Sequence, residues 1–422
     1  MTARGDQFSL FENGVLYFTR PDPSAAEESV HFPLLMHPAP RRVLLIGGGM
    51  GGSLEELLKY PSLDKATYIE IDPGVIRLAG EYMSPEERAF LRDPRVEIVH
   101  ADGRRHLQSA AGRYDAIIVN LPDPFTAQLN RYYTREFFAL AKSRLNPGGV
   151  LGLAASSAEN YIGGELRNYL SCLHLTLSGV FPFLAVIPGD TCHFIASDRP
   201  DYLSAEPMVL ERRIQERGLD LKYIRSYYLA DRLRPERIAY LKEKIVSAPR
   251  VRPNLDFHPV CYFYDMVFWP TYFADEGEGW FTRFLQRATA VRWWWFLAPP
   301  LAAFLAYPLL RGKKTGGAWV LFPIFTAGFS QIVFQVVILL AFQIFYGSVF
   351  YKLGAIITLF MAGLVLGGWA ITRNLPRLAR PRRLLLKTQV AMCLYPLLIP
   401  AVFSLVARFP GAFTFALGEK LV

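Results

Sequence analysis

Acidic residues are missing from most of the C-terminal third of this 422-residue chain. No Asp or Glu lies between Glu278 and Glu419, whereas fourteen Lys and Arg residues lie there. The net charge of +9 arises in this third, because residues 1–278 hold 36 acids against 31 Lys and Arg. Composition therefore gives no support for a basic nucleic-acid surface in the N-terminal part, and we expect no nucleic-acid partner.

Cysteine is scarce, and the spacings that mark metal sites or disulfide frameworks are missing. Cys172, Cys192, Cys261 and Cys393 show no C-x-x-C pattern, and the seven histidines are scattered. We therefore expect no bound metal and no disulfide scaffold. No cleavable signal is recognisable before the first folded segment, which favours the reducing cytoplasm for residues 1–290.

In place of acids, the C-terminal third has long uncharged runs. Residues 315–351, 353–372 and 388–407 contain no charged side chain. About 20 helical residues cross the hydrocarbon core of a bilayer, which is roughly 30 Å thick. The sequence therefore predicts an α-helical transmembrane region over residues 291–422, with three spans and the lipid bilayer as a partner.

A fourth apolar segment, residues 293–310, is shorter and has two adjacent prolines in its middle. Either a re-entrant hairpin or a fourth, proline-kinked span fits this pattern. The basic linker 373–387 should face the cytoplasm, which puts Lys352 outside and residues 311–314 inside. With a re-entrant segment, residues 1–290 are cytoplasmic, and the chain is a multi-pass protein of the inner membrane.

The first 200 residues alternate between apolar strands and helical patterns. An Asn13-Gly14 pair between two apolar runs predicts a β-hairpin within residues 7–20. The strands expected after it are 42–48, 66–72, 96–101, 114–120, 150–155, 183–188 and 192–197. The helices expected between them are 53–60, 73–82, 134–145 and 163–180. Apolar strands separated by helices favour an α/β fold, a doubly wound Rossmann-like domain with a parallel sheet covered on both faces.

These patterns divide the chain into four predicted parts. They are an N-terminal hairpin region (1–40), a Rossmann-like nucleoside-binding domain (41–200), a helical appendage with linker (201–290) and the transmembrane region (291–422).

Glycines and acids follow the first three strands of the Rossmann-like domain, at the edge where open parallel sheets bind ligands. Residues 47–52 (GGGMGG) allow close approach of a ligand and present amide donors at the start of a helix. Glu70 lies about 20 residues further on, a spacing suited to two vicinal ribose hydroxyls. Asp102 precedes Gly103 after the third strand, where a carboxylate can accept from an adenine amine. The sequence therefore predicts a nucleoside pocket.

Seven stretches within residues 7–200 resemble the polyamine aminopropyltransferases, or spermidine synthases, and especially their membrane-fused bacterial relatives. They are residues 37–49 (HPAPRRVLLIGGG), 70–72 (EID), 102–103 (DG), 114–119 (YDAIIV), 123–124 (DP), 133–138 (YTREFF) and 146–149 (NPGG). The resemblance implies the fold of S-adenosylmethionine-dependent transferases. It also implies decarboxylated S-adenosylmethionine or S-adenosylmethionine as donor and a small-molecule amine as acceptor, and it is compatible with a homo-oligomer.

The resemblance assigns roles to particular residues. In the family, the positions matching Glu70, Asp102 and Gly103 hold the ribose and adenine of the donor. The donor-binding residues that it implies are Gly47, Gly49, Met50, Gly51, Glu70, Asp102 and Gly103. The catalytic residues that it implies, on the loop after the fourth strand, are Asn120 and Asp123.

Four positions depart from the family pattern. Met50 replaces an Asp that pairs with the ammonium of the aminopropyl group, which a thioether cannot do. Asn120 replaces the Asp that takes the proton from the attacking amine, and an amide is no base at neutral pH. The histidine that contacts the acceptor falls at Ala26, and a proline that covers the base falls at Ala127. Asp123 is then the acid left in this loop for catalysis.

Three functions follow from these matches and departures. The first is aminopropyl transfer to an amine in polyamine biosynthesis, by a membrane-anchored spermidine synthase-like transferase. The second is methyl transfer from S-adenosylmethionine, because Asn120-Leu-Pro is similar to the Asn/Asp-Pro-Pro loops of amino-group methyltransferases. The third is a catalytically inactive membrane protein that senses a sulfonium nucleoside. The nucleoside product would distinguish them: methylthioadenosine indicates the first function, S-adenosylhomocysteine the second, and no product the third.

Overall fold

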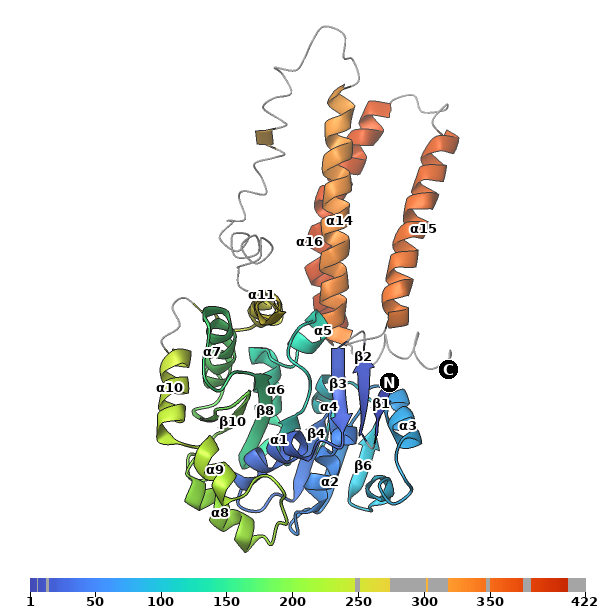
Figure 1. Cartoon of the computed structure of the whole chain (residues 1–422). Coiled ribbons are helices and arrows are strands. Elements are labelled where there is room, and N and C mark those ends of the chain that lie inside the picture. The colour runs from blue at the N-terminus through green and yellow to red at the C-terminus, as the bar shows by residue number, and fades with distance from the viewer. Residues whose placement is uncertain are drawn as a thin grey trace. The chain divides into compact units, whose positions relative to one another are not determined.

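The computed structural model describes residues 1–5, 7–12, 15–246, 251–273, 301–302, 318–346, 350–374 and 381–408. The chain divides into two compact units, Met1–Thr282 and Arg283–Val422 (Figure 1). The predicted Asn13-Gly14 turn and most of the proline-rich segment 293–310 lie outside the described residues.

The first unit contains the strands and most of the helices. Its strands are β1 (Thr2–Arg4), β2 (Gln7–Glu12), β3 (Val15–Arg20), β4 (Arg42–Ile46), β5 (Lys65–Ile69), β6 (Val96–Val99), β7 (Tyr114–Val119), β8 (Leu145–Ser156), β9 (Phe183–Ile187) and β10 (Thr191–Ser197). Its α-helices are α1 (Pro23–Leu35), α2 (Ser53–Leu58), α3 (Pro73–Glu81), α4 (Gly103–Ser109), α5 (Ala127–Asn130), α6 (Arg135–Ser143), α7 (Gly164–Ser178), α8 (Pro207–Glu216), α9 (Ser226–Arg232), α10 (Pro235–Val246) and α11 (Val260–Phe273). Two 3₁₀ turns are η1 (Gly49–Gly51) and η2 (Ala89–Arg92).

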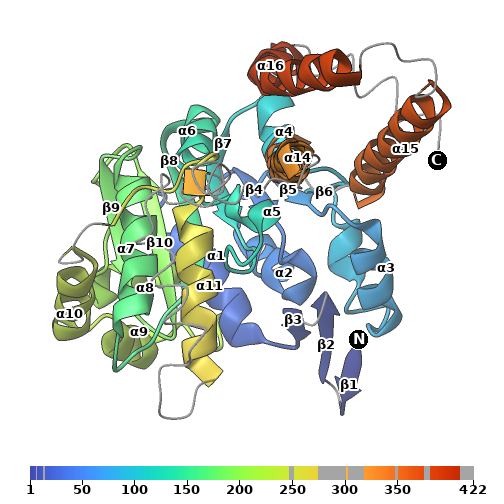
Figure 2. The ribbon, with the colours of Figure 1, turned by 90° about the horizontal axis from the view of Figure 1, so that it is seen from above.

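Seven strands form one mixed sheet in the order β6-β5-β4-β7-β8-β10-β9 (Figure 2). The five strands from β6 to β8 are parallel, whereas β10 pairs antiparallel with both β8 and β9. The order reverses direction at β4, so the crevice beside its carboxyl end is the expected ligand site of such a sheet. This mixed sheet confirms the predicted doubly wound fold, and its antiparallel edge was not foreseen.

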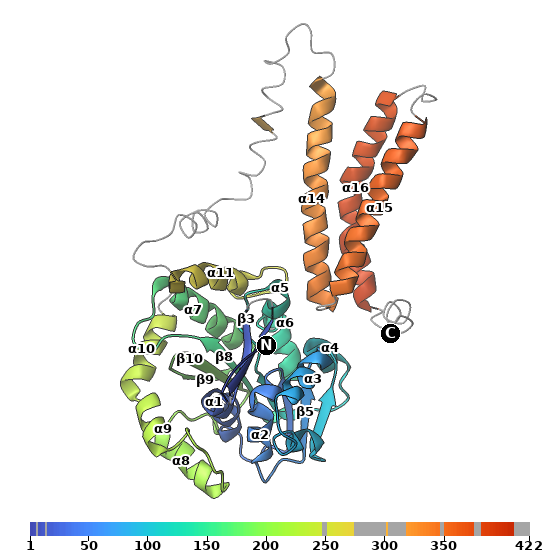
Figure 3. The same cartoon turned by 45° about the vertical axis from the view of Figure 1, so that its right-hand side comes forward.

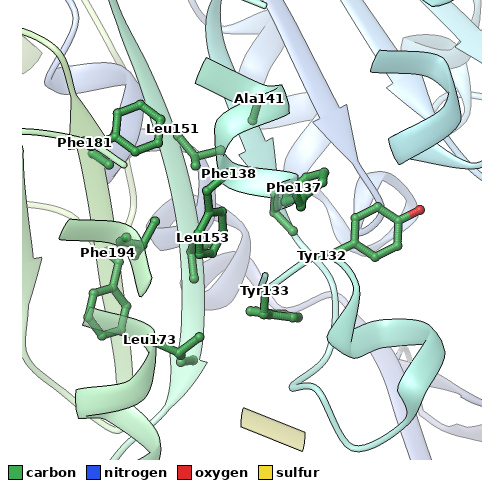
Figure 4. Close-up of a cluster of buried hydrophobic side chains, with 14 of the residues drawn as sticks. Tyr132, Tyr133, Phe137, Phe138, Ala141, Leu151, Leu153, Leu173, Phe181 and Phe194 are labelled. Atoms are coloured by element: carbon green, nitrogen blue, oxygen red, sulfur yellow. The ribbon is translucent and has the colours of Figure 1, made fainter. Parts of the chain in front are cut away.

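Alternate residues of the central strands feed two hydrophobic clusters on opposite faces of the sheet. In β4, Leu44 and Ile46 belong to the cluster shared with α6 and α7, part of which is drawn in Figure 4. Val43 and Leu45 belong to the cluster shared with α1 and α2. Because both faces are covered, β4 is apolar from Val43 to Ile46 and β7 from Ala116 to Val119, with no alternation in the sequence.

The N-terminal hairpin forms as predicted, since β2 and β3 pair antiparallel, and β1 adds a third strand to this small sheet. Helix α1 was not predicted. Asp22 caps it by accepting from the backbone N–H of Ala25, and Pro23 stands in its first turn. Residues 26–35 are all buried, so the helix has no polar face and its sequence lacks the 3.6-residue period that predicts helices.

The second unit contains three described long helices, α14 (Ala318–Tyr346), α15 (Phe350–Asn374) and α16 (Pro381–Arg408). By length and composition, Pro323–Gln343 and Gly354–Asn374 are apolar enough to cross a membrane. The first lies within the predicted span 315–351, the second overlaps the predicted span 353–372, and the third predicted span, 388–407, lies within α16.

Candidate nucleoside and catalytic site

The glycine-rich loop after β4 has a backbone that only glycine adopts easily. Gly47 and Gly48 have φ angles of 74° and 69°, in the left-handed region. A Cβ at Gly47 would lie 2.7 Å from the carbonyl oxygen of Asn120, and one at Gly48 would overlap the Asn120 amide group. The loop therefore packs directly against the segment after β7, so the predicted donor loop and catalytic loop are neighbours.

The other predicted glycines also lie where a side chain would clash with its neighbours. A Cβ at Gly49 would lie 2.6 Å from the ring of Tyr68, and one at Gly103 would lie 2.8 Å from Ile46. Gly51 faces Phe18 of β3, and a Cβ at Gly51 would lie 3.2 Å from the Cβ of Phe18. The hairpin thus borders the glycine-rich loop, a long-range contact that the sequence pattern did not predict.

Glu70 lies directly after β5 and is only 2% exposed. Its Oε2 accepts hydrogen bonds from the hydroxyls of Tyr68, at 2.9 Å, and Tyr17, at 3.2 Å. Its Oε1 accepts from the backbone N–H of Asp72 at 3.2 Å. Burial raises the pKa of Glu70 above its ordinary value, against the opposing effect of these donors. The carboxylate is thus fixed in orientation and weakly hydrated, as a ligand-gripping acid should be.

Asp102 caps α4 and is held by a buried cation. Its two carboxylate oxygens each accept from Arg131 at 2.8 Å, and Oδ2 also accepts from the Tyr132 hydroxyl at 3.0 Å. The backbone N–H of Arg105 donates to Oδ1 at 3.0 Å. A carboxylate has about four acceptor positions, and these four donors use them. An adenine amine would therefore have to replace one donor, and the two uncharged donors are the Tyr132 hydroxyl and the Arg105 backbone N–H.

Arg131 is connected to the end of the helical appendage. Its carbonyl oxygen accepts from Arg104, whose guanidinium forms a buried ion pair with Asp256 at 2.5 Å. Asp256 also accepts from Thr134 at 2.7 Å. The segment before α11 is thereby tied to the predicted adenine side of the site.

The two predicted catalytic residues make different contacts. Asn120 donates through Nδ2 to the hydroxyl of Ser53, at the start of α2, at 2.8 Å. Asp123 accepts from the Tyr169 hydroxyl at 2.7 Å and from the Ser156 backbone N–H at 3.1 Å. Asn120 thus belongs to the glycine-rich loop side, whereas the Asp123 carboxylate points to the end of β8 and to α7.

Met50 and Ala26 mark the departures from the family pattern. Met50 is 1% exposed and lies in the hydrophobic cluster of the α1–α2 face. Ala26 lines a cavity of about 570 Å³ together with Gly51, Gly52 and the Arg20–Glu55 ion pair, among other residues. Space therefore exists beside the glycine-rich loop, at the position where the resemblance led us to expect an acceptor-contacting histidine. The remaining departure, Ala127, opens α5 behind the Thr126 cap.

Several residues of the site were missed by the sequence reasoning. Tyr68 could have been found, because it stands two positions before Glu70 and so shares its face of the strand. Tyr17, Arg131 and Asp256 carry no local signal, since they reach the site from other parts of the chain. Among the described residues, no group of three or more His, Cys, Asp and Glu side chains could hold a metal ion.

Comparisons with a family model and with curated proteins point to the same family. The model of the spermine/spermidine synthase domain matches residues 24–188. A polyamine aminopropyltransferase of Nitrosomonas europaea is 34% identical over 200 residues, which cover 46% of this chain and 61% of that protein. Polyamine aminopropyltransferase 1 of Hyperthermus butylicus is 32% identical over 245 residues, which cover 54% of this chain and 82% of that protein.

The spermidine synthase of Thermotoga maritima aligns with a TM-score of 0.44 and 26% identity, over 56% of this chain and 78% of that one. The family expected from the motifs is thus confirmed by the curated relatives. This chain belongs to the polyamine aminopropyltransferase family, a family of transferase enzymes.

Proposed function

We propose that this chain is a membrane-anchored aminopropyltransferase, which transfers an aminopropyl group from decarboxylated S-adenosylmethionine to a small-molecule amine. The observation that carries the proposal is Glu70, a buried carboxylate held by two tyrosines at the end of β5. At that place in a parallel sheet, about 20 residues after a glycine-rich loop, a carboxylate suits the two hydroxyls of a ribose. Family membership supports the reaction class.

In this reaction the amine attacks the carbon next to the sulfonium of the donor. A C–N bond forms, the C–S bond breaks, methylthioadenosine leaves, and the amine loses one proton. Asn120 cannot accept that proton, so Asp123 is the proposed base and electrostatic partner. The hydroxyl of Tyr169 and the N–H of Ser156 hold the Asp123 carboxylate in place.

Methyl transfer from S-adenosylmethionine is the second candidate, and Met50 is the observation that favours it. An Asp at this position would repel the α-carboxylate that S-adenosylmethionine carries and its decarboxylated form lacks. Met50 has no charge, so that repulsion is missing. A nucleoside-sensing protein without catalysis is the third candidate, since both Met50 and Asn120 depart from the family pattern.

The membrane anchor and its orientation are part of the proposal. In Pro323–Gln343 and Gly354–Asn374, 6% and 0% of the most apolar window is buried. Core helices of soluble proteins bury their apolar residues, so apolar helices left exposed favour lipid as their surroundings. The positive-inside rule then gives a multi-pass protein of the inner membrane with its first unit in the cytoplasm.

Product analysis tests the function. The full chain in detergent is incubated with each donor and butane-1,4-diamine, and the nucleoside products are identified by mass spectrometry. Methylthioadenosine supports aminopropyl transfer, whereas S-adenosylhomocysteine assigns the chain to the methyltransferases. Donor binding without either product assigns it to the sensors. Glu70→Ala is the matched control, because weaker donor binding should slow product formation at low donor concentration in the first two cases.

A further inference from the structure

One ionisable group near the predicted catalytic loop comes from α11, outside the part of the chain that the family model matches. Asp265 is 2% exposed. Within the described residues, its Oδ2 is fully buried and has no hydrogen-bond partner. A buried carboxyl oxygen without a partner is costly and needs an explanation, which a ligand that donates to it would provide.

The position of Asp265 is well fixed. Helix α11 packs along α7 (Figure 3). Asn254, just before α11, donates to the Asn130 side chain at 3.0 Å and to the Tyr133 carbonyl at 2.9 Å. Its own oxygen accepts from the backbone N–H of Cys261 at 3.1 Å. The first turns of α11 are therefore anchored to the segment that follows the catalytic loop.

The groups facing Asp265 are acidic or neutral. Asp123, on the loop after β7, is close enough for its charge to raise the pKa of Asp265, and the charge of Asp265 in turn raises the pKa of Tyr133, Tyr169 and Cys261. Burial, followed by the negative charge of Asp123, raises the pKa of Asp265 to about 8. No Lys, Arg or His in the described part of the chain forms an ion pair with either acid.

Two carboxyl groups in a desolvated place cannot both ionise without a counter-charge. One positive charge between them would allow both to ionise, and the proton held by Asp265 would leave to solvent. An ammonium group supplies this charge together with three N–H donors, which match the unpartnered oxygen. Asp123 lies at the carboxyl edge of the sheet, where the backbone N–H of Ser156 at the end of β8 donates to it.

We propose that Asp265 and Asp123 together bind one ammonium group of the acceptor amine, which makes Asp265 a specificity-determining residue. This inference rests on the proposed function, because it assigns the amine subsite of the same reaction. It adds a residue from the helical appendage to a site otherwise built from the Rossmann-like domain and the N-terminal hairpin.

Calorimetry on the full chain in detergent tests the proposal, with butane-1,4-diamine as probe and butane-1,4-diol as its uncharged match. The wild type should bind the diamine and not the diol, and its affinity should rise from pH 6.5 to 8 as Asp265 ionises. Asp265→Asn should weaken diamine binding roughly tenfold to a hundredfold, the worth of one close charge pair, and remove the pH dependence. Glu243 is an exposed acid on α10. The control variant Glu243→Gln should change neither the diamine affinity nor its pH dependence.

Donor binding by Asp265→Asn reports on its folding and should equal that of the wild type. Equal diamine affinity in wild type and Asp265→Asn, or equal binding of diol and diamine, overturns the proposal. Unchanged transfer rates and amine KM in Asp265→Asn would reject the subsite and leave the transferase function standing. Asp265-dependent diamine binding with no transfer product would support the subsite and reject the transferase function.

Discussion

Arg131 and Asp102 form a two-bonded ion pair with almost no contact with water. Both guanidinium nitrogens of Arg131 lie 2.8 Å from carboxylate oxygens of Asp102, and the two side chains are 1% and 8% exposed. The pair binds the start of α4 to the segment after α5. Its buried charges satisfy each other, so the loss of one partner costs more than the loss of both.

We expect Arg131→Met to lower the free energy of unfolding of the first unit by about 3–5 kcal/mol, because Asp102 is left buried without its cation. The double variant Arg131→Met/Asp102→Asn should recover part of this loss. Denaturant unfolding of the full chain in detergent, followed by tyrosine and tryptophan fluorescence, measures both. Simple addition of the two single effects would contradict this coupling.

Glu70 should control donor affinity and its pH dependence. Glu70→Ala removes the proposed acceptor of the ribose hydroxyls and should cost about 1–3 kcal/mol of donor binding. In the wild type, affinity should fall on acidification as Glu70 gains a proton, and this should begin above the ordinary value of 4.5 because burial raises the pKa of Glu70. Calorimetry between pH 5 and 8 checks this. Unchanged affinity in the variant rejects the assignment.

The sheet and the glycine-rich loop were predictable from the sequence because local signals determine them. Apolar strands, a glycine cluster and strand-end acids each occupy a short stretch, and the structure places Gly48 against Asn120 as adjacent strand ends require. Arg131 and Asp256 were not predictable, because an ion pair between residues distant in the sequence leaves no periodic pattern. Helix α1, buried from Ala26 to Leu35, escaped for a related reason, since this stretch has no exposed face to reveal its period.

Met50 should decide how the chain discriminates between donors. Since no carboxylate stands at this position, we expect the wild type to bind S-adenosylmethionine at least as well as its decarboxylated form. Met50→Asp should shift the preference toward the decarboxylated form by roughly tenfold to a hundredfold. Met50 is buried, so the variant should also melt at a lower temperature.

Four dissociation constants, for two donors and two proteins, test this prediction. Met50→Asn is the control, because it introduces a polar group of similar shape to Asp without the charge and should leave the preference unchanged. A strong wild-type preference for the decarboxylated donor would contradict it and favour the ordinary family reaction.

Membrane topology is testable by cysteine labelling in a background that lacks the four natural cysteines. A cysteine at Ser348 should react with an impermeant reagent applied to whole cells, whereas one at Ala379 should react only after permeabilisation. The opposite pattern would contradict both the cytoplasmic location of the first unit and the interpretation of residues 293–310 as a re-entrant segment.

Asp265 should make the first unit less stable as pH rises. In the unfolded chain an aspartate ionises near its ordinary value of 3.8, whereas in the folded unit the pKa of Asp265 is about 8. Between these values the folded state keeps a proton that the unfolded state has lost, so stability falls across this range and the loss is complete above about pH 8. Asp265→Asn cannot ionise and should escape this loss.

The variant should therefore melt higher than the wild type at pH 8.5, and the difference should shrink toward pH 5. For a cost of about 1–3 kcal/mol, typical of an unsatisfied buried polar group, the gain is roughly 2–4 °C per kcal/mol in a unit of this size. A thiol-reactive dye can follow melting, because Cys172, Cys192 and Cys261 are buried and only Cys393, replaced by Ser, is exposed among the four. Glu243→Gln should melt like the wild type at both pH values. A difference between wild type and Asp265→Asn that is the same at pH 5 and pH 8.5 would show that ionisation of Asp265 carries no cost.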